Sequence, residues 1–310
     1  MTSQTDIAPQ SADDAPSPSV RGESPTRPFY WSVRRELWEN RSIYVAPLVV
    51  AALILFGDLI SSGSLAEKMR LVSALTPARQ AARLAEPREF IAMLLVVTGL
   101  VVAAVYCLGA LHNERRDRSI LFWKSLPVSN LTTVLSKASI PLVVLPIVIF
   151  AVAVVTQLII TVWASLVLLA NGVSAAPLWT QVPFAQMTLV LLYGLTAIAL
   201  WYAPIYGWLI LVSGWARRAA FLWAVLPPIG LCIVEKIAFD SSNLASVFGN
   251  RITGFAGDAF NFNAPGAMSE PLRQIDPIRY LSSPGLWLGL LAAAAFLAAA
   301  VWLRRRRDPI

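Results

Sequence analysis

The sequence predicts an all-α integral membrane protein with six transmembrane helices, and three observations support this prediction. The 310-residue chain is 57% hydrophobic and has a mean hydropathy of +0.63. Only 14% of its residues are charged, whereas soluble domains carry about 25%. Six apolar runs approach the roughly 20 residues that a helix needs to cross a bilayer. A water-soluble globule is therefore not expected.

The N-terminal region is predicted to contain two parts before the first apolar run. Residues 1–28 hold five prolines and no aromatic residue, so they cannot bury enough apolar area to fold, and we expect a disordered tail. Residues 29–42 mix aromatic and charged residues, with Trp31, Arg35 and Trp38 at helical spacing. This pattern predicts an amphipathic helix at the lipid headgroups; the alternative is an ordinary lead-in to the first span.

The transmembrane domain is predicted to cover residues 43–303. Helices are expected because open strands would leave backbone groups unpaired in lipid. The third run is longer than a bilayer requires and should tilt, protrude or bend near Pro141 and Pro146; Pro227-Pro228 in the fifth run predict a kink or a break. The six runs lie near residues 43–60, 89–112, 139–169, 185–212, 220–239 and 285–303.

Lysine and arginine in the connections predict that both termini are cytoplasmic. The connection 113–137, the turn 213–219 and the basic C-terminus 304–310 all carry arginine, and with six helices they fall on one side. The connection 61–88 is also basic, although this orientation puts it outside. We keep the orientation with both termini in the cytoplasm, because three basic segments support it and one contradicts it.

Two extracytoplasmic regions follow from this orientation. In residues 61–88, Ser64 to Glu67 fits a capping box and Thr76-Pro77 fits a helix start, so two short amphipathic helices are expected. Residues 240–284 are rich in Gly, Asn and Pro with interleaved phenylalanines. They predict a partly ordered cap, with disorder as the alternative.

No common catalytic or cofactor motif is present. The sequence has no G-x-x-x-x-G-K-[ST] phosphate loop, no G-x-S-x-G, no H-E-x-x-H and no G-x-G-x-x-G after a strand. Cys107, Cys232 and His112 form no metal-ligand pattern. Nucleic-acid binding is not expected, since the basic residues lie at the ends of apolar runs. These absences favour transport, scaffold or receptor roles over catalysis.

The most informative segment is the connection 113–129 between the second and third runs. Glu114 and Arg118 are spaced as a helical ion pair. Ile120 to Trp123 then add more apolar bulk than a solvated linker needs, Pro127 ends the helix, and Ser129 is placed to cap the next one. We expect a short rigid helix parallel to the membrane, which either docks into a partner protein or covers lipid headgroups.

Polar residues inside the third and fourth runs are candidates for a substrate path. Trp201, Tyr202, Tyr206 and Trp208 cluster toward the inner half of the fourth run, where they suit an interfacial belt or the lining of a path for an amphipathic substrate. Asp58, Glu235 and Lys236 lie near the outer ends of their runs, as interfacial residues do. The candidate lining residues are Thr156, Gln157, Tyr193, Thr196 and Trp201.

Residues 114–129 resemble the segment E-R-x-x-[GR]-[ST]…L-P-V-S of type-2 ABC transporter permeases, the ABC-2 exporter family. The resemblance of architecture covers about residues 29–307, and the local motif covers 16 residues. In that family the segment is a coupling helix held by a separate P-loop ATPase, which binds ATP and Mg, so this chain itself needs no cofactor. The residues that the resemblance assigns to ATPase coupling are Glu114, Arg115, Arg116, Asp117, Arg118, Phe122, Trp123 and Pro127.

The resemblance further implies a non-enzymatic permease subunit in the inner or plasma membrane of a bacterial cell. It is expected to pair with a second copy or a paralogue and to export a lipophilic or amphipathic substrate. Residues 240–284 are longer than the corresponding region in many relatives. The leading alternative is a membrane scaffold or sensor without an ATPase. An intramembrane enzyme would need paired polar groups at one depth, and the sequence offers none. A secondary carrier would be expected to show a mid-span charge and an internal repeat, and neither is visible in the sequence.

Overall fold

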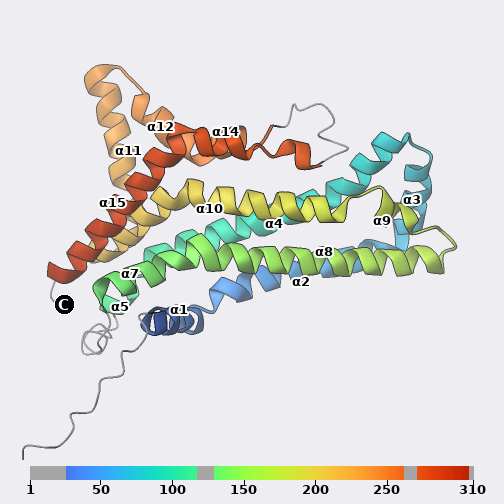
Figure 1. Ribbon diagram of the computed structural model, residues 1–310, viewed down its shortest axis with the longest axis horizontal. Helices are drawn as coiled ribbons and strands as arrows, with labels where there is room; N and C mark the ends of the chain where they lie inside the picture. Colours follow the sequence, from blue (N-terminus) through green and yellow to red (C-terminus); the bar gives the residue numbers. More distant parts are fainter. Residues whose placement is uncertain (1–25, 117–128, 262–270, 307–310) are drawn as a thin grey trace, which may run out of the picture.

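The computed structural model describes residues 26–116, 129–261 and 271–306, and almost all of them are helical (Figure 1). Six helical segments of the described chain are long and apolar enough to cross a membrane. The elements are α1 (Thr26–Glu39), α2 (Ser42–Ser61), η1 (Ser62–Ser64), α3 (Leu65–Ser73), α4 (Pro77–Gly109), α5 (His112–Arg116), α7 (Asn130–Ser139), η2 (Ile140–Val144), α8 (Leu145–Ala170), α9 (Ala176–Thr180), α10 (Phe184–Trp215), α11 (Ala220–Phe239), α12 (Asn243–Thr253), α13 (Phe255–Ala259), η3 (Pro271–Gln274), α14 (Pro277–Ser282) and α15 (Pro284–Arg306).

The bundle has two different ends. At one end lie α1, α5, α7 and the last turn of α15, so both ends of the described chain meet there; we call it the termini end (Figure 1). At the other, which we call the far end, α3 and α9 connect the long helices α2, α4, α8 and α10. The shared position of α1 and the end of α15 agrees with the even number of spans.

Helix α15 packs closely along the second half of α10. A Cβ atom added at Gly207 of α10 would lie 3.2 Å from the carbonyl oxygen of Ala293 in α15. Small residues permit this approach of two backbones, as is common between membrane helices. Helix α11 instead stands away from the bundle, and α12 and α14 return from its tip to lie against α10 (Figure 1).

The largest apolar core lies in the termini half and joins α2, α4, α7, α8 and α10. It includes the fully buried Ile43, Leu95, Cys107, Val134 and Ile210. Many other large apolar side chains point outward, for example Phe221, Leu226 and Ile237 along α11. Exposed apolar surface on this scale is typical of helices that face lipid. The prediction of an all-α membrane architecture with six spans is confirmed.

The structure corrects several local predictions at the N-terminal side. Helix α1 begins at Thr26, so residues 26–28 belong to it and not to the predicted tail; residues 1–25 lie outside the described chain. The second of the two outer helices is not separate, because α4 runs unbroken from Pro77 through Pro87 into the second span. Ser64 makes no side-chain capping bond at α3, so the predicted capping box is wrong.

The two proline predictions have different outcomes. The third run joins α7, η2 and α8 into one helical stretch of 41 residues, and η2 is a π-helical turn that contains Pro141. At about 1.5 Å per residue this stretch exceeds a ~30 Å hydrocarbon core, so the predicted excess length is confirmed. In the fifth run, α11 continues through Pro227 and Pro228, so no break occurs there.

Candidate functional site: a buried ionic junction and a cavity

A cluster of buried ion pairs joins four helices at the termini end. The Nζ atom of Lys137 lies 2.7 Å from Oε1 of Glu36 and 3.0 Å from Oε1 of Glu114. The Nη1 atom of Arg304 lies 2.8 Å from Oε2 of Glu114, and Nη2 of Arg35 lies 2.9 Å from Oε1 of Glu114. We call Arg35, Glu36, Glu114, Lys137 and Arg304 the ionic junction.

Each member reaches the junction because of its place on its helix. Glu36 shares a face of α1 with Val33 and Leu37, which pack against the core, so its carboxylate is carried inward. Lys137 lies in the last turn of α7 and Arg304 in the last turn of α15. Helix C-terminal carbonyl groups carry partial negative charge, which favours a cation at Arg304, whereas the helix continues past Lys137 into η2 and α8.

The junction is closed to water and its hydrogen bonds are largely satisfied. The side chains of Lys137 and Glu36 are 2% and 1% exposed. Tyr106 of α4 donates from its hydroxyl to Oε2 of Glu36 at 2.8 Å. Arg304 donates from Nε to Oδ1 of Asn130 at 3.2 Å. Removing one partner from such a buried pair typically costs about 3–5 kcal/mol, because the other charge is left uncompensated.

Glu39 completes the charge balance at the rim. Its Oε1 atom lies 3.3 Å from Nε of Arg35, one turn earlier in α1. Partial burial raises the pKa of the Glu39 carboxyl, and Arg35 offsets part of this effect. With Glu39 included, three carboxylates face three cations, so the cluster carries no net charge when all six groups are ionised.

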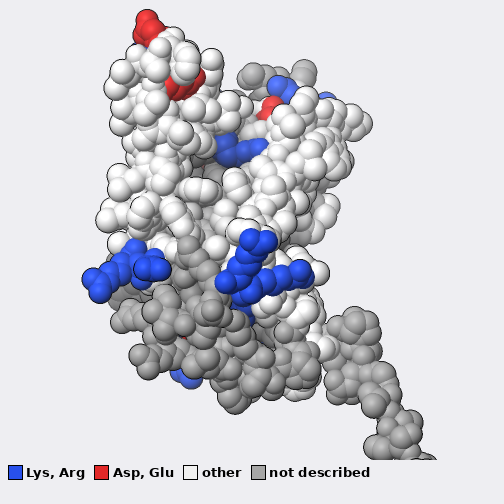
Figure 2. All heavy atoms as spheres, turned by 90° about the vertical axis from the view of Figure 1, so that its left-hand side faces the viewer, with Lys and Arg blue, Asp and Glu red and all other residues white. Residues whose placement is uncertain are grey.

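The outer surface around this neutral cluster is basic. Figure 2 looks onto the termini end and shows lysine and arginine side chains gathered there. Arg217 and Arg218 are exposed in the turn before α11, and Arg305 and Arg306 are exposed at the end of α15. The acidic partners Glu36 and Glu114 are instead buried. Among the described residues, the exposed charges at this end are therefore mainly positive.

The junction also fixes both ends of the segment predicted to couple to a partner. Glu114 lies in α5, directly before residues 117–128. After that segment the chain resumes at Ser129, whose Oγ accepts a hydrogen bond from the backbone N–H of Thr132 at 3.0 Å. This confirms the predicted cap of α7. The helix that Ser129 begins carries Lys137 into the junction.

Most of the predicted coupling residues lie outside the described chain. Asp117, Arg118, Phe122, Trp123 and Pro127 are in residues 117–128, and the side chains of Arg115 and Arg116 are likewise not described. Glu114 is described, and its carboxylate is buried within this chain. Contact between any of these residues and another protein stays a prediction, and for Glu114 the structure adds an anchoring position.

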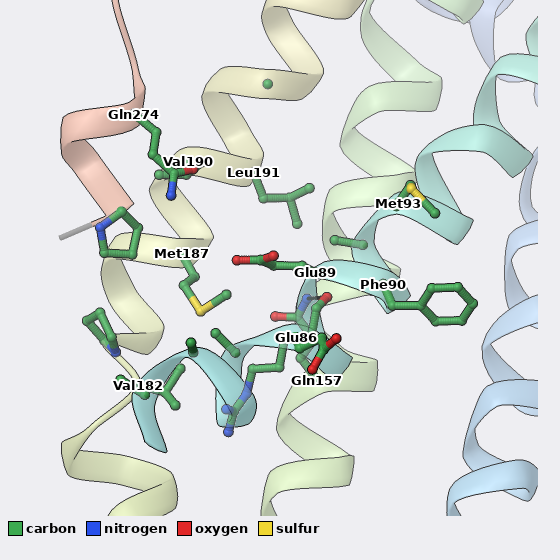
Figure 3. Close-up of a pocket in the computed structure, with 18 of the residues that line it drawn as sticks. Glu86, Glu89, Phe90, Met93, Gln157, Val182, Met187, Val190, Leu191 and Gln274 are labelled. Atoms are coloured by element: carbon green, nitrogen blue, oxygen red, sulfur yellow. Dashed lines mark hydrogen bonds between the residues drawn. The ribbon is translucent and has the colours of Figure 1, made fainter. Parts of the chain in front are cut away.

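A cavity of about 1230 Å³ lies toward the far end, between α4 and the first half of α10 (Figure 3). Its walls are largely apolar, with Phe90, Met93, Met187 and Leu191 among the residues that line it. Gln157 of α8, Gln274 of η3 and two phenylalanines, Phe255 and Phe260, also line it. The charged residues in the lining are Arg79, Arg83, Glu86, Arg88 and Glu89 of α4. This combination of apolar walls and a few polar groups is typical of small-molecule sites.

Arg88 is buried and is one of the charged residues that line this cavity. Its Nη2 atom donates to Oγ1 of Thr161 at 3.1 Å and to the carbonyl oxygen of Leu178 at 3.4 Å. Its Nη1 atom donates to the carbonyl oxygen of Leu84 at 3.1 Å. Arg88 therefore joins α4 to α8 and α9 and is one of the basic residues in the predicted outer connection that does not face water.

The structure does not bring the five candidate lining residues together. Gln157 lines the cavity, and its Nε2 atom donates to the carbonyl oxygen of Arg88 at 3.4 Å. Thr156 is buried and bonds to Val152 of its own helix, whereas Thr196 is exposed. Tyr193 and Trp201 instead bind the main chain of residues 251–259.

Aromatic residues of α10 and α14 bind main-chain carbonyl groups across this contact. Tyr193 donates to Ala259, Trp201 donates to Arg251, and Tyr202 donates to Ile252. In the opposite direction, Tyr280 of α14 donates to Ala197 of α10 at 2.7 Å. Because Trp201 and Tyr206 are buried, the belt interpretation is wrong for these two residues. Within the predicted cap, the described residues 243–261 and 271–282 form α12, α13, η3 and α14. The side of the membrane on which they lie stays a prediction.

Sequence reasoning missed Glu36, Lys137 and Arg88. A signal for Glu36 was present, because it is a charged residue on the apolar face of a predicted amphipathic helix. A second signal was Lys137, which lies directly before the long third apolar run. Neither signal predicts which charged residue forms the ion pair, because Glu36, Lys137 and Arg304 are far apart in the chain.

The described residues contain no group of three or more His, Cys, Asp or Glu side chains that could hold a metal ion. No family model, no curated protein and no solved structure matches this chain. The function is therefore argued from the geometry of the junction and the cavity.

Proposed function

We propose that this chain is the membrane-spanning permease subunit of an ATP-driven exporter of the type-2 ABC class. In this proposal a separate cytoplasmic ATPase binds ATP and Mg, and the permease pairs with a second copy or a paralogue in a bacterial inner membrane. The exported substrate is lipophilic or amphipathic. The observation that carries the proposal is the ionic junction, which ties the start of the 113–129 connection to the first and last helices of the chain.

The junction supports transmission of movement because its members are hard to separate. Glu114 is bound to Arg35 of α1, Lys137 of α7 and Arg304 of α15. Separating Arg304 from Glu114 would remove the anionic partner of a buried guanidinium group, and the other members share their partners within the same cluster. A displacement of residues 113–129 by a partner would therefore move these three helices as one body, as in a rigid-body transition.

The basic surface of the termini end supports a cytoplasmic position for that end. We expect a Ser125→Cys variant to react with a membrane-impermeant maleimide only in inside-out vesicles. The control is a cysteine placed at the far end by Ser174→Cys, which should react only in right-side-out vesicles. Labelling of position 125 from the outside would contradict the proposal.

Affinity purification from native membranes tests the proposed partner. We expect a P-loop ATPase to co-purify in equal amount. A permease that purifies alone, with transport unaffected by ATP depletion, would favour the alternative of a scaffold or sensor without an ATPase.

A substitution in the connection tests the coupling itself. Trp123→Ala should weaken ATPase docking about thirtyfold, because aromatic anchors at interfaces commonly contribute about 2 kcal/mol. Permease-dependent stimulation of ATP hydrolysis should fall accordingly, without a loss of membrane insertion. The matched control is Trp179→Ala, which removes a half-exposed tryptophan at the far end. Normal stimulation in the Trp123→Ala variant would contradict the docking assignment.

A further inference from the structure

Helix α1 has an exposed face that combines arginine with aromatic side chains. Tyr30, Arg34 and Trp38 follow one another at intervals of four residues and form one row along the helix, with Trp31 beside it. The Cζ atom of Arg34 lies 5.1 Å from the ring centroid of Trp31 and 5.0 Å from that of Trp38. The two tryptophans are 57% and 68% exposed. We call these four residues, with Arg41 of the turn that follows, the exposed face of α1.

The carboxylates of α1 do not neutralise this face. Glu36 is buried and pairs with Lys137, and Glu39 pairs with Arg35. Within the described part of the chain, neither Arg34 nor Arg41 forms an ion pair. The two guanidinium groups of the exposed face can therefore meet an anion from outside the chain.

The exposed face lies next to a point where the chain enters the membrane. Helix α1 lies beside α5 and α7 at the termini end (Figure 1), and only Asn40 and Arg41 separate it from α2, the first candidate span. The first turns of α2 already expose large apolar side chains, among them Val45 and Leu48. Tryptophan and tyrosine near the end of a span prefer the level of the lipid headgroups.

The last span ends with the same combination of residues. The Cζ atom of Arg306 lies 4.4 Å from the ring centroid of Trp302, and this tryptophan is 53% exposed. Trp302 and Arg306 lie in the last turns of α15, at the same end of the bundle as α1. Two separate helices thus place an arginine on an exposed tryptophan where the spans end.

We propose that the exposed face of α1 binds the headgroups of anionic phospholipids. The phosphate groups would lie beside Arg34 and Arg41, and the rings of Tyr30, Trp31 and Trp38 would lie in the headgroup layer. A guanidinium group that stacks on a ring keeps its N–H edge free, and this edge can donate two parallel hydrogen bonds to a phosphate. An anionic lipid is favoured over a zwitterionic one because only the anionic lipid adds net negative charge at this level. Lipid is favoured over a protein partner because the face continues into a lipid-facing span. The proposal depends on neither the ATPase nor the substrate.

Hydrogen exchange of residues 29–39 in the full chain tests the proposal. The purified protein is reconstituted into nanodiscs of phosphatidylcholine alone or of phosphatidylcholine and phosphatidylglycerol in equal amounts. We expect exchange at least about tenfold slower with phosphatidylglycerol, since one basic residue near an anionic leaflet contributes about fivefold. A high salt concentration should remove most of the difference. Soluble glycerol phosphate, added to phosphatidylcholine nanodiscs, should not reproduce it.

Three double variants locate the site. Arg34→Gln with Arg41→Gln should bring exchange in the two kinds of nanodisc to within about twofold. Arg34→Lys with Arg41→Lys keeps the charge and should retain most of the difference. The matched control, Arg217→Gln with Arg218→Gln, removes the same charge from the same end and should leave exchange of residues 29–39 unchanged. Unchanged exchange of α7 in each variant shows that the ionic junction is intact.

The remaining outcomes would overturn the proposal. Equal exchange in the two kinds of nanodisc would show that α1 does not select anionic lipid. An equal loss in the Arg217 and Arg218 control would show a general effect of surface charge, without a site on α1. Slower exchange that requires an added ATPase and is the same in both lipids would assign the face to a protein partner. Because the test contains no ATPase, its failure leaves the exporter proposal standing, and the failure of the exporter proposal leaves the lipid site standing.

Discussion

Two regions of the molecule, the termini end and the contact of α12 and α14 with α10, bury polar groups in different ways. At the termini end, charges from α1, α5, α7 and α15 share partners, so that Glu114 alone contacts three cations. At the far side of α10, each contact joins one side-chain donor to one main-chain carbonyl group, as between Tyr280 and Ala197. Removing one charge at the termini end affects several ion pairs at once, whereas removing one donor at the α10 contact breaks a single hydrogen bond. The difference indicates that the termini end is rigid. The contact of α12 and α14 with α10 and the start of α15 is adaptable, and we call it the adaptable end; it is distinct from the far end at α3 and α9.

The largest expected effect comes from breaking the ionic junction. Lys137→Met removes the ammonium group that Glu36 and Glu114 share, while keeping a side chain of similar length. We expect a loss of about 3–5 kcal/mol in stability, because two buried carboxylates lose a partner. The measurement is the thermal melting of the detergent-solubilised protein followed by size-exclusion fluorescence.

The chain offers a matched control for this prediction. Lys236 also lies 2.7 Å from a carboxylate, that of Asp240, but the lysine side chain is 61% exposed. Lys236→Met should change stability by less than about 1 kcal/mol, as for exposed pairs in general. Similar melting temperatures for the two variants would show that the termini end does not depend on its buried charges.

The next effect concerns the adaptable end and depends on Gly289 of α15. Arg251 of α12 lies over the ring of Trp201 at 4.6 Å and donates from Nη2 to the carbonyl oxygen of Gly285 at 2.8 Å. A Cβ atom at Gly289 would clash with that Nη2 atom. Gly289→Ala should therefore displace Arg251 and weaken the docking of α12 by about 1–3 kcal/mol.

Hydrogen exchange of residues 243–253 measures this loosening. We expect faster exchange in Gly289→Ala, confined to the α12 region, with the termini end unchanged. The control is Gly230→Ala in α11, where no atom lies within 4 Å of an added Cβ; it gives the same helix-propensity gain without the clash. Exchange that rises equally at both ends would contradict the distinction between a rigid and an adaptable end.

The sequence predicted the elements better than the contacts between them. Hydropathy predicted the spans because it depends on local composition. Ser129 was predicted as the cap of α7 because capping involves a residue only three positions away. The ionic junction was not predicted, since a helical pattern shows that Glu36 faces inward but not that Lys137 and Arg304 meet it.

The outer helix that begins at Thr76-Pro77 starts where the sequence predicted, but its predicted separation from the second span was wrong. The sequence suggested a boundary before the second span, yet α4 continues through Pro87. In that turn Arg88 donates to the carbonyl oxygen of Leu84 and is itself fixed by Thr161 of α8. The partner on α8 lies 73 residues away in the chain, so no local pattern could have predicted this support.

The smallest expected effect sharpens the comparison at the level of single caps. Ser129 and Ser64 both precede a helix and both looked like N-caps in the sequence, but only Ser129 accepts a backbone hydrogen bond, from Thr132. Ser129→Ala should cost about 1 kcal/mol, whereas Ser64→Ala should be close to neutral. Thermal melting of the two variants side by side measures the difference. A loss at Ser64 equal to that at Ser129 would mean that the serine hydroxyl contributes through the unfolded chain or through solvent rather than through the cap. In that case the hydrogen bond between Ser129 and Thr132 would not add to the stability of the termini end, which would then depend on the buried ion pairs.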